Sequence, residues 1–337
     1  MRGKSKNPVL KRANRCHIGV DLLGSDVSPQ ELLEAIIAFR KQLSLSVQLT
    51  LFGTEELFKR APCASDNTVF YPVSEEIHMS DDPLRAIRYK KQSSLYLGVQ
   101  MLKEGHIDAI VSAGNTGALM AASKVLLSPL PRVERPALLT LLPTRRSDVA
   151  VLDVGANTSF KAKHLMQFAL MGVAFQKTRG ISLPKVGLLN IGSEAKKGTP
   201  ELRAAYDLLK DSSRASSFAF IGNIEARAVF QGDIDVLVTD GFTGNILLKT
   251  AEGIGLVILD ELEAATRQKD LSPLKAALVE LRHHLHYAQY PGALLCGVKG
   301  IVIKCHGTAM TQSVLSSITS ATRLVEHHFL ESICSFL

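Results

Sequence analysis

Two glycine-bearing loops have the residue types of small anion-binding sites. The first spans Ser112–Gly117 and reads SAGNTG, and the second spans Asp240–Asn245 and reads DGFTGN. Each loop falls between an apolar run and an amphipathic run, so main-chain N–H groups and the positive end of a helix dipole converge there. Taken singly, such a loop is more often an ordinary strand-to-helix turn. We expect the two loops to end neighbouring strands, which favours a shared anion site that includes Gly114, Asn115, Thr116 and Gly117.

Two adjacent lysines form a second candidate group. Lys196 and Lys197 stand directly before Gly198, ahead of a helix-like run, in a loop that begins at Asn190. The spacing is not that of a phosphate-binding P-loop, in which the lysine follows the glycine. A solvated loop is the plain interpretation. The functional interpretation, which we favour, is a pair of ammonium groups aimed at an oxyanion.

Carboxylates and amides at other strand ends complete the candidate set. Asp153 and Asn157 follow an apolar run, where they either orient neighbouring groups or contact a substrate. Asp240 and Asn245 border the second glycine loop. His306 follows an apolar run, and a hydrogen-bonded core histidine is as good an interpretation there as a site residue.

The sequence lacks the motifs of several other chemistries. No GxGxxG follows an apolar run, so a nicotinamide dinucleotide site is poorly supported, and neither GxSxG nor HExxH occurs. The sequence therefore predicts neither a metal nor a cofactor. Five scattered cysteines without metal-ligand spacing fit a reducing cytoplasm. They are Cys16, Cys63, Cys296, Cys305 and Cys334.

Apolar runs alternate with glycine-containing turns and amphipathic runs along most of the chain. This alternation predicts an α/β fold with a doubly wound, mostly parallel sheet, in which ligands collect at the carboxyl ends of the strands. One long helix is expected over Pro83–Glu104, and Ser28 and Glu31 predict a capping box at the start of another. The predicted strands are His17–Asp21, Val47–Phe52, Val69–Val73, Ala109–Val111, Ala137–Leu142, Val149–Asp153, Val186–Asn190, Phe218–Gly222, Val236–Thr239 and Ile301–Ile303.

Length and charge set the domain organisation and the kind of partner. The 337 residues predict a basic tail at 1–15 and a single α/β domain at 16–337, with an amphipathic helical excursion at 266–290. No uninterrupted apolar stretch approaches the roughly 18 residues needed to cross a bilayer. A net charge of +7 indicates an anionic partner. The 6% aromatic content and the lack of a reading module argue against nucleic acid.

Read in order, these loops resemble the PlsX family of phosphate acyltransferases from bacterial phospholipid synthesis. Each sequence block alone is weak evidence for the family, but the ordered set of blocks is specific and spans nearly the whole chain. The first block departs from the family's VDAMGGD because Ser25 replaces its second glycine. The late block reads HGTAM from His306, where the family has HGSSD. The matching blocks are Val20–Asp26, Ser112–Leu119, Leu152–Asn157, Gly187–Gly192, Phe220–Glu225, Thr239–Asn245 and His306-Gly307.

The resemblance implies a fold similar to those of phosphotransacetylases and isopropylmalate dehydrogenase, and it implies a homodimer. It also implies reversible transfer of a fatty acyl group from acyl carrier protein to inorganic phosphate, which gives an acyl phosphate. That product would feed a membrane glycerol-3-phosphate acyltransferase. A cytoplasmic protein with optional peripheral membrane contact is therefore expected.

Such chemistry needs few catalytic groups. Phosphate is itself the nucleophile and the carrier's thiol is a good leaving group, so neither a covalent serine nor a strong general acid is required. In this hypothesis Lys197, with Lys196 nearby, holds phosphate or the developing oxyanion. Asn245 and the amides around Asn115–Gly117 donate hydrogen bonds, and Asp240 and Asp153 orient these donors.

Two basic clusters and a leucine stripe are candidates for contacts with partners. An acidic carrier protein predicts a basic docking surface, although each cluster is equally well a solvated face. Leucines spaced by three and four residues from Leu271 to Leu285 predict core or dimer packing, with lipid contact as the alternative. The clusters are Arg85, Arg88, Lys90 and Lys91, and Arg282, His283 and His284.

Three other functions compete with this hypothesis. A phosphotransacetylase-like enzyme would use short acyl-coenzyme A, so the choice of donor separates it from the first hypothesis. A dehydrogenase of the isopropylmalate type is disfavoured because the dinucleotide fingerprint is missing. A non-catalytic, membrane-associated scaffold would show no turnover with any acyl donor.

Overall fold

The computed structural model of the chain describes residues 16–59, 61, 67–213, 218–268, 278, 281, 292–305 and 311–337. The expected tail at 1–15, most of the expected excursion at 266–290 and His306 lie outside these residues. The cluster at 282–284 also lies outside them, as does most of the leucine stripe.

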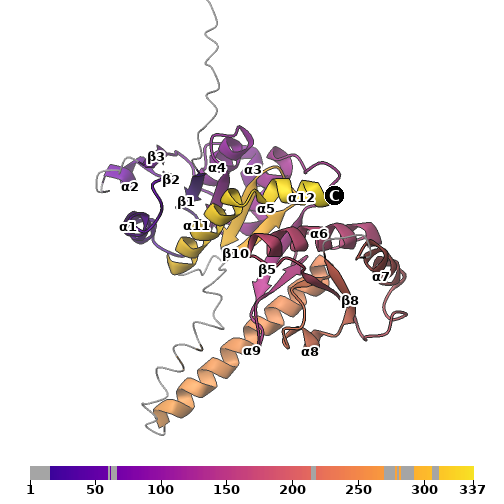
Figure 1. Cartoon of the computed structure of the whole chain (residues 1–337). Helices are drawn as coiled ribbons and strands as arrows, with labels where there is room; N and C mark the ends of the chain where they lie inside the picture. The colour runs from indigo at the N-terminus through magenta and orange to yellow at the C-terminus, as the bar shows by residue number, and fades with distance from the viewer. Residues whose placement is uncertain are drawn as a thin grey trace, which may run out of the picture.

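In the described residues, one continuous sheet of eleven strands forms the framework, in the order β3-β2-β1-β4-β11-β10-β5-β6-β9-β7-β8 (Figure 1). Most neighbouring strands pair in parallel. The prediction of an α/β fold with a mostly parallel sheet is therefore confirmed. The strands are β1 (Cys16–Asp21), β2 (Val47–Gly53), β3 (Thr68–Pro72), β4 (Ala109–Ser112), β5 (Ala137–Leu142), β6 (Val149–Leu152), β7 (Lys185–Leu189), β8 (Ala219–Ile224), β9 (Val236–Val238), β10 (Gly292–Cys296) and β11 (Ile301–Cys305).

Antiparallel pairing in the middle of the sheet reverses the strand direction between its two halves. Strand β10 is antiparallel to both β11 and β5, and β5 is antiparallel to β6. Consequently β1, β4 and β11 run one way, whereas β6, β9 and β7 run the other way. The expectation that the loops after β4 and β9 end neighbouring strands is wrong. Four strands separate β4 from β9, and the carboxyl ends of the two lie at opposite edges of the sheet.

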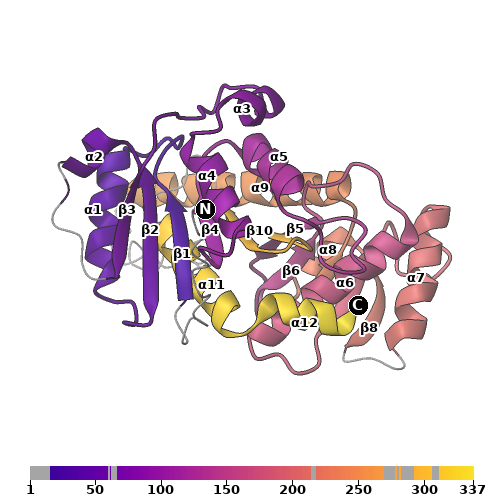
Figure 2. The same cartoon turned by 90° about the horizontal axis from the view of Figure 1, so that it is seen from above.

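Helices cover both faces of the sheet and bury two apolar layers. One layer packs under α1, α6, α7, α11 and α12, and the other packs under α3, α4, α5 and α8. Figure 2 shows α11 and α12 crossing from one half of the sheet to the other. The helices are α1 (Pro29–Arg40), α2 (Glu55–Lys59), α3 (Pro83–Tyr89), α4 (Ser94–Lys103), α5 (Thr116–Leu126), α6 (Ala162–Thr178), α7 (Pro200–Ser213), α8 (Ala226–Val229), α9 (Gly241–Gln268), α11 (Thr311–Glu326) and α12 (Phe329–Phe336).

The single helix expected over Pro83–Glu104 is two helices, α3 and α4. Ser93 provides the second start, because its hydroxyl accepts a hydrogen bond from the Tyr96 amide and donates one to the Lys90 carbonyl. The Glu75 carboxylate also accepts from the amide of Gln92, at 2.7 Å. These polar groups offer the backbone partners outside the helical ladder, so the helix ends and begins again.

Helix α1 begins at Pro29, as predicted, but without the expected capping box. The Ser28 side chain makes no capping hydrogen bond. The Glu31 carboxylate instead accepts from the Thr311 hydroxyl at 3.1 Å, which ties α1 to α11. A long-range contact has therefore replaced the local one.

Helix α9 is the longest helix described and extends away from the sheet (Figure 1). Its 28 residues span about 42 Å at 1.5 Å per residue. The segment Gly241–Thr266 is long and apolar enough to cross a membrane by length and composition alone, and little of it is buried. Several large apolar side chains on it are exposed, namely Ile246, Ile254, Leu256, Val257, Ile258 and Leu262.

Candidate active site at the β6, β9 and β7 edge

Three adjacent parallel strands, β6, β9 and β7, deliver three of the predicted loops to one edge of the sheet. The loop after β6 carries Asp153 and Asn157, and the loop after β9 carries Asp240 and Asn245. The loop after β7 runs from Asn190 to Lys196 and Lys197. The structure therefore brings seven of the candidate residues together.

Asp153 holds the first of these loops in shape. Its side chain is fully buried, and its Oδ1 accepts from the amides of Leu138, Gly155 and Ala156 at 2.9–3.1 Å. Its Oδ2 accepts from the main-chain and side-chain nitrogens of Asn157, both at 2.8 Å. Asp153 thus orients the donors of its own loop and of the Leu138 main chain.

The start of α9 packs directly on that loop. Asp240 caps the helix, because its Oδ1 accepts from the amides of Phe242 and Thr243 at 3.0 Å. A Cβ at Gly244 would lie 2.0 Å from the Asp153 carbonyl oxygen, and a Cβ at Gly241 would lie 2.4 Å from that of Asn157. Both glycines are needed for this close approach, which places the positive end of α9 at the edge.

The Asn190 side-chain amide holds the lysine loop in shape, and the side chains of Lys196 and Lys197 are exposed. The Asn190 side chain donates to the Lys197 carbonyl at 3.1 Å and accepts from the Ile191 amide. Lys197 is 49% exposed, and its Nζ lies 3.9 Å from the Glu194 carboxylate, which is a loose ion pair. Lys196 is exposed. Both lysines can therefore turn toward an anion at this edge.

Asn223 also supports the lysine loop, although it was not among the residues predicted for the site. It is buried in β8, and its Nδ2 donates to the Glu194 carbonyl at 2.8 Å. Its Oδ1 has no hydrogen-bond partner among the described residues. The signal was present, since an asparagine in an otherwise apolar strand must find a polar partner.

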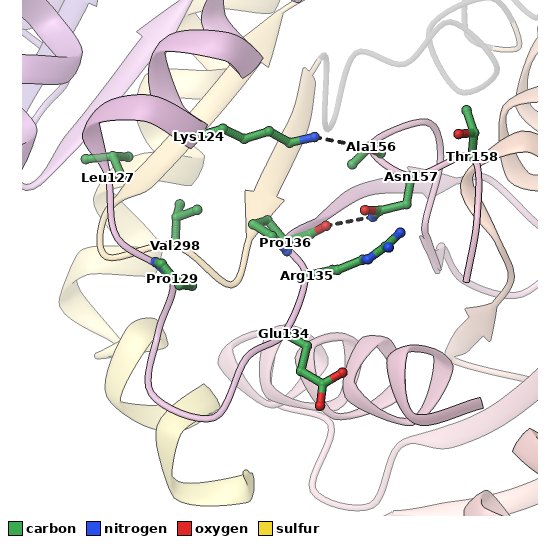
Figure 3. Close-up of a pocket in the computed structure, with 10 residues that line it drawn as sticks. All are labelled: Lys124, Leu127, Pro129, Glu134, Arg135, Pro136, Ala156, Asn157, Thr158 and Val298. Atoms are coloured by element: carbon green, nitrogen blue, oxygen red, sulfur yellow. Dashed lines mark hydrogen bonds between the residues drawn. The ribbon is translucent and has the colours of Figure 1, made fainter. Parts of the chain in front are cut away.

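A cavity of about 370 Å³ lies beside the Asp153–Asn157 loop (Figure 3). Two cations, Lys124 and Arg135, and the Glu134 carboxylate border it. Lys124 reaches from α5 to the Ala156 carbonyl at 3.3 Å, and Arg135 donates to the Ser159 carbonyl at 2.7 Å. Apolar lining comes from Leu127, Pro129, Pro136 and Val298.

Neither cation was predicted, because neither stands in a motif. Lys124 lies late in α5 and Arg135 lies in the connection before β5. The fold brings both to the cavity, where basic groups and an apolar lining face the same space.

A buried histidine lies next to the cavity. His164 Nε2 lies 3.1 Å from the Glu134 carboxylate, which also pairs with Lys163 at 2.6 Å. Burial, followed by the nearby Arg135 charge, lowers the pKa of His164. The Lys163 ammonium lowers the pKa of Glu134.

The other predicted glycine loop lies at the opposite edge, at the far end of α5. Asn115 caps α5 through the Ala118 amide at 3.0 Å, and Gly117 packs against the Pro83 ring. Along α5, the rise from Thr116 in this loop to Lys124 is about 12 Å at 1.5 Å per residue. The structure thus does not join Gly114, Asn115, Thr116 and Gly117 to the lysine loop within one chain.

Two buried ionisable groups, Asp21 and Lys304, lie near the Ser112–Gly117 loop. Asp21 accepts from the Ser112 hydroxyl at 2.8 Å, and burial raises the pKa of Asp21. Lys304 on β11 donates to the carbonyls of Ala113 and Cys305. Burial lowers the pKa of the Lys304 ammonium to about 8. No cluster of three metal-ligating side chains occurs in the part of the chain that the structure describes.

Comparisons with known proteins place the chain in a family. The model of a family described as "Fatty acid synthesis protein" matches residues 16–332. A phosphate acyltransferase from Exiguobacterium sp. (strain ATCC BAA-1283 / AT1b) is 40% identical over 324 residues, which cover 94% of this chain and 97% of the relative. A phosphate acyltransferase from Geobacillus sp. (strain WCH70) is 38% identical, with the same coverage.

A solved structure shares the fold. A phosphotransacetylase from Streptococcus pyogenes superposes with a TM-score of 0.63 at 15% identity, over 93% of this chain and 94% of that one. The protein thus has an α/β fold of the same architecture as that phosphotransacetylase. The family match and the curated relatives go further, and the chain belongs to the fatty acid synthesis protein family, whose phosphate acyltransferases it resembles over nearly its whole length. It is an acyltransferase.

Proposed function

We propose that the protein transfers a fatty acyl group from acyl carrier protein to inorganic phosphate and so forms an acyl phosphate. The observation that carries the proposal is the meeting of the lysine loop, the start of α9 and the Asp153–Asn157 loop beside a cavity with two cations. A site of this composition binds an anion and stabilises a second negative charge that forms next to it.

In the proposed reaction a phosphate oxygen attacks the thioester carbon. Lys197, aided by Lys196, holds the phosphate, and the positive end of α9 and the Asn245 amide stabilise the negative oxygen that forms on the carbonyl. A carbon–oxygen bond forms and the carbon–sulfur bond breaks, so the pantetheine sulfur leaves as a thiolate and takes a proton from solvent. Asp153 and Asp240 fix these donors in place.

Apolar side chains near the lysines and at the start of α9 suit a donor with a fatty chain. Ile191 in the lysine loop is 82% exposed, and Phe242 in the first turn of α9 is 63% exposed. Exposed apolar groups of this size beside a polar site are typical of ligand or partner contact. We assign them to the acyl chain.

We further propose that α9 mediates a homodimer, with peripheral lipid contact as the alternative. Its exposed isoleucine, leucine and valine side chains would be buried from water by either a second subunit or lipid. The protein would act in the cytoplasm and release its product to a membrane glycerol-3-phosphate acyltransferase.

A direct test uses the purified protein with a long-chain acyl carrier protein and phosphate, and hydroxylamine to trap acyl phosphate as the hydroxamate. We expect hydroxamate to form only when phosphate is present. Short acyl-coenzyme A serves as the rival donor. A higher kcat/KM with that donor would assign the protein to the short-chain phosphotransacetylase class.

A further inference from the structure

Helix α3 presents an apolar and basic surface on one side of the molecule. Figure 2 shows α3 standing out beyond α4 and α5. Leu84 is 71% exposed and Tyr89 is 65% exposed, and Met79 in the preceding loop is 46% exposed. Large apolar groups left in water on one short helix mark a contact surface.

The base of this surface is fixed to the body of the protein. Asp82 caps α3 through the Arg85 amide at 2.8 Å, and Ala86 and Ile87 are buried beneath. Lys90 closes the far end, since its Nζ lies 2.6 Å from Asp81 and donates to a main-chain carbonyl at 2.8 Å. The Asn115 side chain donates to three carbonyls of the loop before α3. The helix is therefore held in position before any partner arrives.

The charges on the outward side are cationic and are not used inside the protein. Arg85, Arg88 and Lys91 are exposed, and none forms an ion pair in the part of the chain that the structure describes. The Arg88 guanidinium lies 5.5 Å from the centre of the Tyr89 ring, so the two side chains present one combined surface. Of the four cations in the first predicted docking cluster, Lys90 is the one already paired.

We infer that α3 is the docking surface for the acidic acyl carrier protein. This inference rests on the proposed function, which supplies the carrier as the acyl donor. Arginine and tyrosine are the residues that most often dominate binding at protein interfaces, and free cations around them select an acidic partner. We name Leu84, Arg85, Arg88 and Tyr89 the α3 face.

A second copy of this chain fits the α3 face poorly. In a two-fold interface each patch meets itself, so Arg85 and Arg88 would face their own copies and repel. An acidic carrier has the opposite charge and avoids this repulsion.

Helix α5 extends from beneath the α3 face to the cavity beside the active site. Its first turn packs under Pro83, and Lys124 in its last turn contacts the Ala156 carbonyl beside the cavity. A pantetheine arm that left a carrier docked on α3 would have to run about the length of α5, or about 16 Å, to reach the cavity.

The test reverses the charges of the α3 face and compares donors with and without the carrier. The variant is Arg85→Glu/Arg88→Glu, and the matched control is Lys41→Glu/Lys210→Glu, which makes the same change of net charge at exposed positions elsewhere. We expect the KM for long-chain acyl carrier protein to rise about tenfold at low salt in the variant alone. Its kcat/KM for S-octanoyl-pantetheine should match that of the wild type, which also shows that the variant is folded.

A second variant, Leu84→Ser/Tyr89→Ser, keeps the cations and should raise the same KM at both low and high salt. The effect of the charge reversal should shrink at high salt, because salt screens exposed charges. If the charge-reversal variant and the control have equal KM values for the carrier donor, the docking assignment is refuted while the proposed reaction stands.

Two further outcomes keep the proposals apart. If the wild type makes no acyl phosphate from any donor, the proposed function fails and this inference fails with it. If the α3 variant loses binding to phosphatidylglycerol vesicles but keeps its KM for the carrier, the α3 face is a membrane contact and the carrier assignment is wrong.

Discussion

Replacing Asp153 by asparagine tests whether this carboxylate builds the loop on which the site stands. Its two oxygens accept five hydrogen bonds, three at Oδ1 and two at Oδ2. An asparagine side chain has one acceptor oxygen, and its NH₂ group only donates. Whichever way the amide turns, at least two buried donors lose their acceptor.

The structure sets the size of the effect. If the amide oxygen faces Leu138, Gly155 and Ala156, the main-chain N–H of Asn157 and one N–H of its side-chain amide lose their acceptor, while the other side-chain N–H keeps the Pro136 carbonyl at 2.7 Å. Each buried, unsatisfied donor costs about 1–3 kcal/mol, so the variant should lose about 2–6 kcal/mol of unfolding free energy. That is a large fraction of the roughly 5–15 kcal/mol by which folded proteins are stable.

The measurement is urea unfolding followed by circular dichroism, with Asp207→Asn as the control. Asp207 is exposed on α7, so its change should stay within about 0.5 kcal/mol. At a temperature where the Asp153→Asn protein is still folded, turnover should also fall, because the start of α9 packs on the altered loop. A loss of stability no larger than that of the control would refute the reasoning.

Three further predictions concern the site and its surroundings. Lys197→Ala should lower kcat about 100- to 1000-fold without shifting the unfolding midpoint, whereas near-native turnover would remove Lys197 from the mechanism. Gly244→Ala should unfold at lower urea, because its Cβ would lie 2.0 Å from the Asp153 carbonyl oxygen. A Cβ at Gly253 in the same helix would meet nothing within 4 Å, so Gly253→Ala should gain about 1 kcal/mol of unfolding free energy. Similar urea midpoints for the two variants would contradict the packing described. Folding lowers the pKa of Lys304 from 10.5 to about 8. Between pH 8 and 10.5 the unfolded chain therefore binds more protons than the folded one, so the free energy of unfolding should rise with pH across that window. Subtracting the stability curve of Lys304→Met from that of the wild type isolates this rise, and a flat difference between pH 8 and 10.5 would exclude it.

The local elements could be predicted from the sequence because their signals are local. The apolar runs and turn residues placed ten of the eleven described strands within a few residues, and Pro29 marked the start of α1 correctly. Strand β10 (Gly292–Cys296) was missed. The break between α3 and α4 was missed because it depends partly on Glu75, a residue distant in sequence whose carboxylate binds the Gln92 amide. Helix ends that rely on tertiary partners are not encoded in the helix itself.

The grouping of the site residues depended on strand order, which the sequence does not reveal. Asp153, Asp240 and Lys197 meet because β6, β9 and β7 are neighbours. The loop at Gly114 was wrongly grouped with them, because the insertion of β10 and the β5–β6 pairing reverse the second half of the sheet. Lys124 and Arg135 were missed for the same reason, since only the fold brings them to the cavity.

The most direct test of the account is the position of phosphate in a crystal of the protein soaked in that ion. We predict that the ion binds between Lys197 and the first turn of α9, at the edge formed by β6, β9 and β7. Phosphate bound instead at Thr116 on the opposite edge, with Lys197 directed into solvent, would contradict the central claim.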